Sequence, residues 1–169
     1  MAASCHIEIA IQQEDFSHAE IYAQMRQRQF AQAGSIVSFV GLVRDRNERA
    51  GDGGEVQGLS LEHYPGMTEN SMQKIAEQAQ ERWPLLQINI IHRVGDLLPD
   101  DQIVMVLVAS AHRSAAFAAA EYLMDFLKTE AILWKLEKSS LGTKWLRSTT
   151  EDHDRSAAWG DGKIQQGAE

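Results

Sequence analysis

Two lysines stand out in the segment MDFLKTEAILWKLE, residues 124–137, because Lys128 and Lys135 lie in one of the most apolar stretches of the chain. Lysine is among the side chains least often fully buried. If Lys135 is recessed beside other cations, desolvation and like charge both lower its pKa, which makes the amine a better proton acceptor. Simpler interpretations remain open: a last-turn helix cation for Lys128, and a snorkelling lysine or a surface pair with Glu137 for Lys135.

Three more candidate residues come at places where apolar runs end. The sequence SAHR, residues 110–113, stands where a strand pattern gives way to a helix pattern. Such a junction offers unpaired N–H groups and the positive end of the helix dipole to a phosphate or carboxylate. Arg113 could hold that anion through two bonds, with His112 as a further donor when protonated. A surface arginine with a capping or core histidine is the alternative, and Arg44 is an ordinary charge at a strand end if no ligand binds there.

Other chemistries have little support in the sequence. The histidines and acidic residues show no metal-ligand spacing, and the phosphate-loop, dinucleotide-binding and nucleophile-elbow motifs do not occur, so we expect no metal and no cofactor. Cys5 is the only cysteine, which excludes an intrachain disulfide. It is either an incidental thiol or, with a base and a shaped pocket nearby, a catalytic one.

The composition predicts a soluble protein with one core. The chain has 169 residues, 44% of them hydrophobic, and its net charge of −8 argues against a broad basic surface for nucleic acid, so any anion site must be local. No apolar run approaches the roughly 20 residues of a membrane span, and the N-terminus does not resemble a signal peptide. We expect a cytoplasmic protein with a single domain over residues 1–159 and a disordered tail over residues 160–169.

Hydrophobic patterning predicts the elements that must position these residues. Strands are expected at residues 6–12, 35–43, 56–64, 86–95, 102–110, 131–137 and 144–148. The polar, glycine-rich segment 44–54 predicts a mobile surface loop. Because the strands come mostly in adjacent pairs, and do not alternate one for one with helices, we expect an α+β fold with substantial antiparallel sheet.

Three segments have the pattern of helices. Ser17 and Glu20 have the spacing of a capping box, and Gly34 is the expected end of that first helix. Thr68 is the expected N-cap of the second helix, which stops before a proline. The alanine-rich segment 111–128 predicts a strongly amphipathic third helix that would place Lys128 in its last turn.

Several motifs taken together resemble the large, catalytic subunit of molybdopterin synthase. They are GLVRDRN, LEHYPGMTE, IIHRVGDLLPDD, SAHRSAAF, MDFLKTEAILWKLE and the closing tryptophan of SAAW, in this order over about residues 5–159. Their combination is far more specific than any one motif. The resemblance implies an α/β-hammerhead-like domain with an additional antiparallel β subdomain.

The resemblance also implies a reaction and its partners. Members of the family transfer sulfur to cyclic pyranopterin monophosphate, in two rounds that build the dithiolene of molybdopterin. The sulfur arrives as a thiocarboxylate on the C-terminal Gly-Gly of a small ubiquitin-like partner, whose tail enters a pocket of the large subunit. The family forms a homodimer flanked by two small subunits, which is a heterotetramer. The alternative is a non-catalytic module that binds a ubiquitin-like tail or a phosphorylated ligand.

Matching motifs assign the site residues that the resemblance implies. Lys128 and Lys135 correspond to the catalytic pocket lysines, with Lys135 expected as general base or transition-state contact and Lys128 as anion stabiliser. The implied substrate-binding set is Leu42, Val43, Arg44, His112, Arg113, Lys128, Lys135, Leu136 and Glu137. Leu42 stands where related sequences often carry a lysine, which weakens any claim that this position contacts the phosphate. A self-sulfurated enzyme would depend on Cys5, so imported sulfur fits the chain better.

Overall fold

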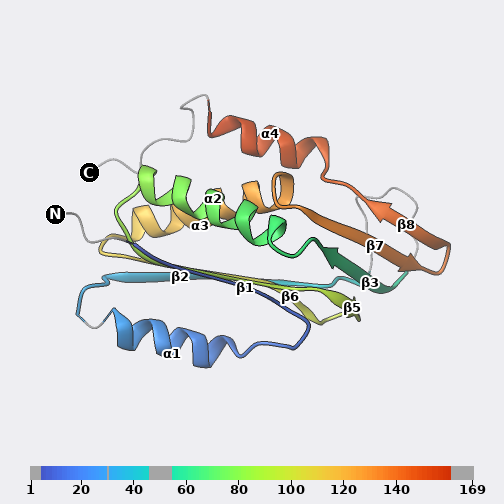
Figure 1. The fold of residues 1–169 in the computed structure, drawn as a ribbon, viewed down its shortest axis with the longest axis horizontal. Helices are drawn as coiled ribbons and strands as arrows, with labels where there is room; N and C mark the ends of the chain where they lie inside the picture. The colour runs from blue at the N-terminus through green and yellow to red at the C-terminus, as the bar shows by residue number, and fades with distance from the viewer. Residues whose placement is uncertain (1–4, 30, 46–54, 161–169) are drawn as a thin grey trace.

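The computed structural model describes residues 5–29, 31–45 and 55–160. Its centre is a four-stranded sheet with the order β1-β4-β6-β2. The strands are β1 (His6–Gln12), β2 (Ser35–Leu42), β4 (Leu85–Arg93) and β6 (Gln102–Ser110). β1 is parallel to β4, whereas β6 is antiparallel to both of its neighbours. The helix α1 (His18–Arg28) covers one face of this sheet, and α2 (Met67–Arg82) and α3 (Arg113–Thr129) cover the other (Figure 1).

A second four-stranded sheet, with the order β5-β3-β7-β8, extends from one end of the first (Figure 1). Its strands are β3 (Val56–His63), β5 (Gly95–Leu97), β7 (Leu133–Ser139) and β8 (Gly142–Leu146), all antiparallel. The helix α4 (Thr150–Ala158) follows β8 and lies near the C-terminal end of α3. The α+β class is therefore confirmed, and the second sheet corresponds to the expected antiparallel subdomain.

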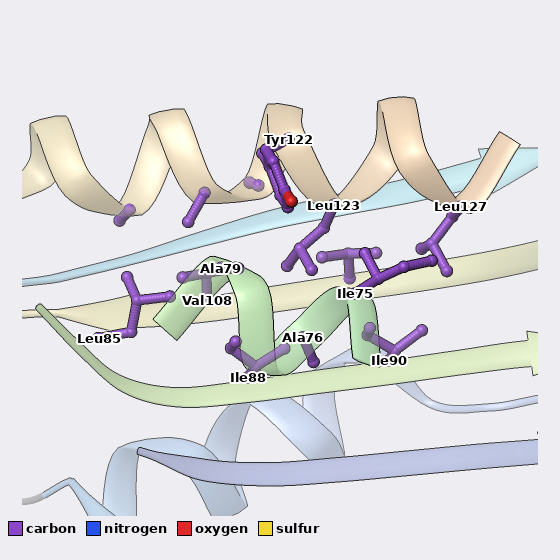
Figure 2. Close-up of a cluster of buried hydrophobic side chains, with 14 of the residues drawn as sticks. Ile75, Ala76, Ala79, Leu85, Ile88, Ile90, Val108, Tyr122, Leu123 and Leu127 are labelled. Carbon is purple, nitrogen blue, oxygen red and sulfur yellow. The ribbon is translucent and has the colours of Figure 1, made fainter. Parts of the chain in front are cut away.

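The two central strands, β4 and β6, are mostly apolar because both of their faces are covered. Along β6, Val104, Val106 and Val108 join the cluster under α2 and α3, and the alternate residues join the cluster under α1. Figure 2 shows the first cluster, in which Ile88 and Ile90 of β4 meet apolar side chains of α2 and α3. Alternating side chains of one strand thus bind two layers of helix to one sheet.

Two predicted helix boundaries are wrong for identifiable reasons. The first helix ends at Arg28, with Gln29 as its C-cap, and not at Gly34. Gly34 is required instead by a close approach, because a Cβ at this position would lie 2.2 Å from the carbonyl oxygen of Ala111. The N-cap of α2 is Gly66, and Thr68 lies within the helix, where its buried hydroxyl accepts from the backbone N–H of Tyr64 and donates to the carbonyl of Ile132.

Two elements were not predicted. The three-residue strand β5 is too short to show alternation, and α4, with the sequence TEDHDRSAA, has too few apolar residues to show a helical pattern. Residues 46–54 of the predicted loop and residues 161–169 of the predicted tail lie outside the described residues. Of the helices in the described ranges, none is long and apolar enough to cross a membrane.

The packing of α2 predicts a contrast between two adjacent residues. Ile75 is 1% exposed in the main cluster, whereas its neighbour Lys74 is exposed. Ile75→Ala should lower the free energy of unfolding by about 2–5 kcal/mol, because it removes buried methyl groups and leaves a cavity. Lys74→Ala should change it by no more than about 0.5 kcal/mol. Denaturant unfolding of both variants checks this, and equal effects would show that α2 does not pack as described.

Candidate active site

A cavity of about 560 Å³ lies where the two sheets meet the C-terminal end of α3. Most of its wall is apolar and comes from β2, β3, β6, α3 and β8. Its charged and titratable lining residues are Arg44, His92, Lys128, Lys135 and Glu137. Residues far apart in the sequence therefore meet at one opening, and three of them are cations in a chain of net charge −8.

Strand alternation turns Lys135 into this cavity. In β7, Lys135 and Glu137 line the cavity and pair with Leu61 and Leu59 of β3, whose side chains are buried. Burial, and next the positive charge of Lys128, lower the pKa of Lys135 below its usual 10.5, against a smaller opposing effect of Asp152. The recessed position beside another cation makes the neutral amine accessible at lower pH than for an ordinary lysine.

Lys128 reaches the cavity from the last turn of α3, where its side chain is 46% exposed. Its ammonium lies 3.2 Å from Oδ1 of Asp152, at the start of α4. Lys128 therefore has a carboxylate partner on another helix. Its position is not explained by the negative end of the α3 dipole alone. The connection from α3 to β7 is anchored on α2, since the carbonyl of Ile132 accepts from the Thr68 hydroxyl at 2.7 Å.

His92 is a cavity residue for which the sequence suggested no role. It is 4% exposed, and its Nδ1 lies 2.7 Å from the carbonyl oxygen of Arg93. Burial, and then the charge of Lys135, lower its pKa to about 4 despite that hydrogen bond. At neutral pH the imidazole is therefore uncharged, and Nδ1 is the nitrogen that carries the proton. The available signal was the place of His92 directly after two isoleucines of β4, at the start of the motif IIHRVGDLLPDD, to which the sequence analysis assigned no role.

The end of β2 forms another part of the wall. Val43 is buried, and its backbone donates to the carbonyl of Asp101 and accepts from the N–H of Asp100. These bonds fix the chain where it leaves the sheet, so that the exposed Arg44 is held at the cavity. Leu42 also lines the cavity and is 47% exposed.

Three residues of the expected substrate-binding set are not brought to the cavity of this chain. His112 and Arg113 are exposed at the N-terminus of α3, and the helix rise of about 1.5 Å per residue puts Arg113 roughly 22 Å from Lys128. Leu136 is absent from the cavity lining because it alternates with Lys135 and lies on the other face of β7, opposite Trp145 of β8.

Cys5 lies away from this site, packed against the main hydrophobic cluster. It is not among the residues that line the cavity, and burial raises the pKa of its thiol to about 11. The reactive thiolate is therefore scarce at neutral pH, which disfavours a catalytic role for this cysteine.

Comparisons with known proteins cover most of the chain. A family model described as MoaE protein matches residues 11–130. A molybdopterin synthase catalytic subunit of Vibrio cholerae is 51% identical over 89% of this chain and 97% of that protein. Its namesake in Escherichia coli is 41% identical over 90% of this chain and 97% of that protein.

Solved structures agree with the sequence matches. A molybdopterin biosynthesis MoaE protein from Burkholderia ambifaria has a TM-score of 0.76 and 44% identity, covering 91% of this chain and 98% of that one. Molybdopterin synthase from Staphylococcus aureus has a TM-score of 0.70 and 30% identity, covering 80% of this chain and 94% of that one. These matches confirm the resemblance drawn from the motifs: the chain belongs to the MoaE protein family.

Proposed function

We propose that this chain is the catalytic subunit of a molybdopterin synthase and acts as a sulfurtransferase. It transfers sulfur from the C-terminal thiocarboxylate of a small ubiquitin-like partner to cyclic pyranopterin monophosphate. The observation that carries the proposal is the meeting of Lys128, Lys135 and Arg44 at one cavity of an acidic chain. Family membership supports it, because relatives over nearly the whole chain carry this name. A cytoplasmic location is part of the proposal.

The charges of the reactants explain why cations are needed in an apolar wall. The partner's tail is an anion both as a thiocarboxylate before transfer and as a carboxylate after it, and the pterin carries a phosphate. Lys128 and Arg44 are the residues that we assign to these anions. Beside an apolar wall, a fixed cation stabilises such charges more than a freely solvated one would.

Lys135 is the residue that we assign to proton transfer or to contact with the developing charge. Because burial and Lys128 lower its pKa, a larger fraction of this amine is neutral near pH 7 than for an exposed lysine. Lys135 as general base would work in the neutral form. An incoming anion would raise its pKa again and favour the ammonium form, so that proton uptake would be coupled to the presence of substrate.

The assignment of His112 and Arg113 to anion binding requires a second copy of the chain. Both lie at the opposite end of α3 from Lys128, so one protomer does not bring them to its own cavity. In a homodimer the pair would enter the site of the neighbouring protomer. Leu42 and Val43 would form part of the apolar wall, and Glu137 would border the substrate. Leu136 would lie on the other face of β7 and would act only through the position of that strand.

Replacement of the two lysines tests the proposed chemistry. Lys128→Ala and Lys135→Ala should each reduce dithiolene formation from thiocarboxylated partner and pyranopterin substrate by about 100-fold or more, as for loss of a transition-state contact. Lys138→Ala is the matched control, because Lys138 belongs to the same strand but pairs with Asp96 at the surface. The control should retain full turnover and all three variants should bind the partner.

Two results would contradict this scheme. Full product formation by both lysine variants would remove the proposed roles. If the unmodified protein binds the partner and the pterin but yields no dithiolene, the chain is a binding module and not the enzyme.

The source of the sulfur can be tested separately at Cys5. Cys5→Ser should form product at the rate of the unmodified protein, because the half-buried thiol lies outside the cavity and burial raises its pKa to about 11. The rate of dithiolene formation with excess thiocarboxylated partner is the measurement. A loss of turnover in a variant with unchanged thermal stability would show instead that the Cys5 thiol takes part in the reaction.

A further inference from the structure

The first turn of α4 places a carboxylate with two separate tasks beside the cavity. Oδ2 of Asp152 accepts hydrogen bonds from the backbone N–H of Thr149 at 3.0 Å and from its hydroxyl at 2.8 Å. The Thr149 hydroxyl in turn accepts from the backbone N–H of Asp152. This capping box occupies one carboxylate oxygen, and the other oxygen, Oδ1, faces the Lys128 ammonium at 3.2 Å.

The pair of Lys128 and Asp152 differs from an ordinary surface ion pair. The Asp152 side chain is 11% exposed and is already fixed by Thr149, whereas the Lys128 side chain is 46% exposed. A fixed, buried acceptor defines where the ammonium lies. Because Thr149 already holds the Asp152 side chain, Asp152 loses little further conformational freedom when it binds Lys128. Since an ammonium has three donors, Lys128 can keep this bond and still bind an anion in the cavity.

Docking of α4 on α3 is secured at other points. Arg155 of α4 donates to Asp125 at 2.9 Å and to Glu121 at 2.6 Å, both on α3. The indole N–H of the buried Trp159 donates to the second oxygen of Asp125 at 2.9 Å. These contacts hold α4 on α3 without the bond between Asp152 and Lys128. That bond is therefore not needed for docking the helix and can act on the position of Lys128.

We propose that Asp152 is a positioning residue that holds the Lys128 ammonium at the cavity and balances its charge next to Lys135. The proposal deepens the function given above and rests on it. Asp152 itself is not among the residues that line the cavity, so it acts through Lys128 and not on the substrate. The C-terminal helix thereby becomes part of the catalytic arrangement.

The charges around Lys135 predict the direction in which its pKa changes when Asp152 is replaced. The cavity-facing groups are Arg44 after β2, His92 on β4, Lys128 on α3 and Glu137 on β7, with Asp152 on α4 behind Lys128. Lys128 lowers the pKa of Lys135 and Asp152 raises it, whereas His92 is neutral near pH 7. Loss of the Asp152 charge should therefore move the titration of Lys135 to lower pH.

Asp152→Asn tests this with little change of shape, because the amide oxygen can still accept the capping bonds of Thr149. Arg155→Gln is the matched control, since it weakens the docking of α4 but leaves Asp152 and Lys128 in place. For each full-length variant, NMR of labelled lysine side chains follows the titration of Lys135, assigned with Lys135→Arg. Steady-state assays with thiocarboxylated partner and pterin then separate kcat from KM.

Asp152→Asn should lower the Lys135 midpoint and reduce kcat/KM by up to about 100-fold, the loss expected when a reacting group is misplaced by about 1 Å. Arg155→Gln should lower the thermal unfolding midpoint but leave the Lys135 midpoint unchanged. A Lys135 midpoint that does not move in Asp152→Asn would overturn the proposal, and so would an equal shift in Arg155→Gln.

Folding and function can be kept apart in this experiment. If Asp152→Asn does not fold, Asp152→Ser supplies a second neutral side chain, and failure of both would show that the carboxylate serves the cap of α4 and not Lys128. If the unmodified protein forms no dithiolene, the proposed function fails, but the Lys135 titration still decides whether Asp152 sets the charge at this cavity.

Discussion

The repulsion between two ammonium groups at one apolar-walled cavity is the constraint on which the site depends. Lys128 and Lys135 are seven residues apart in the sequence, one at the end of a helix and the other on the strand that follows. The burial of Lys135, and next its proximity to Lys128, disfavour the charged form of the Lys135 amine. Favourable packing and hydrogen bonds elsewhere in the fold must offset the cost of keeping the two lysines close together. An anionic ligand would reduce the repulsion between them.

Three sets of contacts hold the cationic side chains at the cavity despite this repulsion. The cluster beneath α2 and α3 fixes the helix that carries Lys128, and the bond from Thr68 to Ile132 fixes the turn before the strand that carries Lys135. The backbone of Val43 is bonded to the turn before β6, which keeps Arg44 at the rim. Asp152 adds a negative charge. Among the described residues, it is the carboxylate to which the structure shows Lys128 bonded.

Local patterning sufficed to predict most of the fold, because alternation and helical spacing follow directly from burial on one or two faces. It failed where tertiary contacts decide. Gly34 is needed for the carbonyl of Ala111, which no local rule reveals, and α4 is held by Arg155 and Trp159 against a helix that is distant in sequence. Polar helices of this kind lack the apolar stripe that sequence analysis detects.

The site residues also divide into those that the sequence could identify and those that depend on tertiary contacts. Motifs located Arg44, Lys128 and Lys135, and the structure places all three at one cavity. His92 could not be assigned from sequence, because its pKa depends on burial and on the charge of Lys135 across the cavity. The distance between Arg113 and Lys128 follows from the length of α3, but only a second protomer could bring the two ends of that helix to one site.

The most direct test of the account is a crystal structure of this protein bound to the small partner with its C-terminal Gly-Gly. The account predicts that the tail enters the cavity and that its terminal carboxylate lies within about 3.2 Å of the ammonium nitrogen of Lys128 or Lys135, the distance of a charge-assisted hydrogen bond. A complex in which the tail ends elsewhere on the surface, with no contact to either ammonium group, would contradict it.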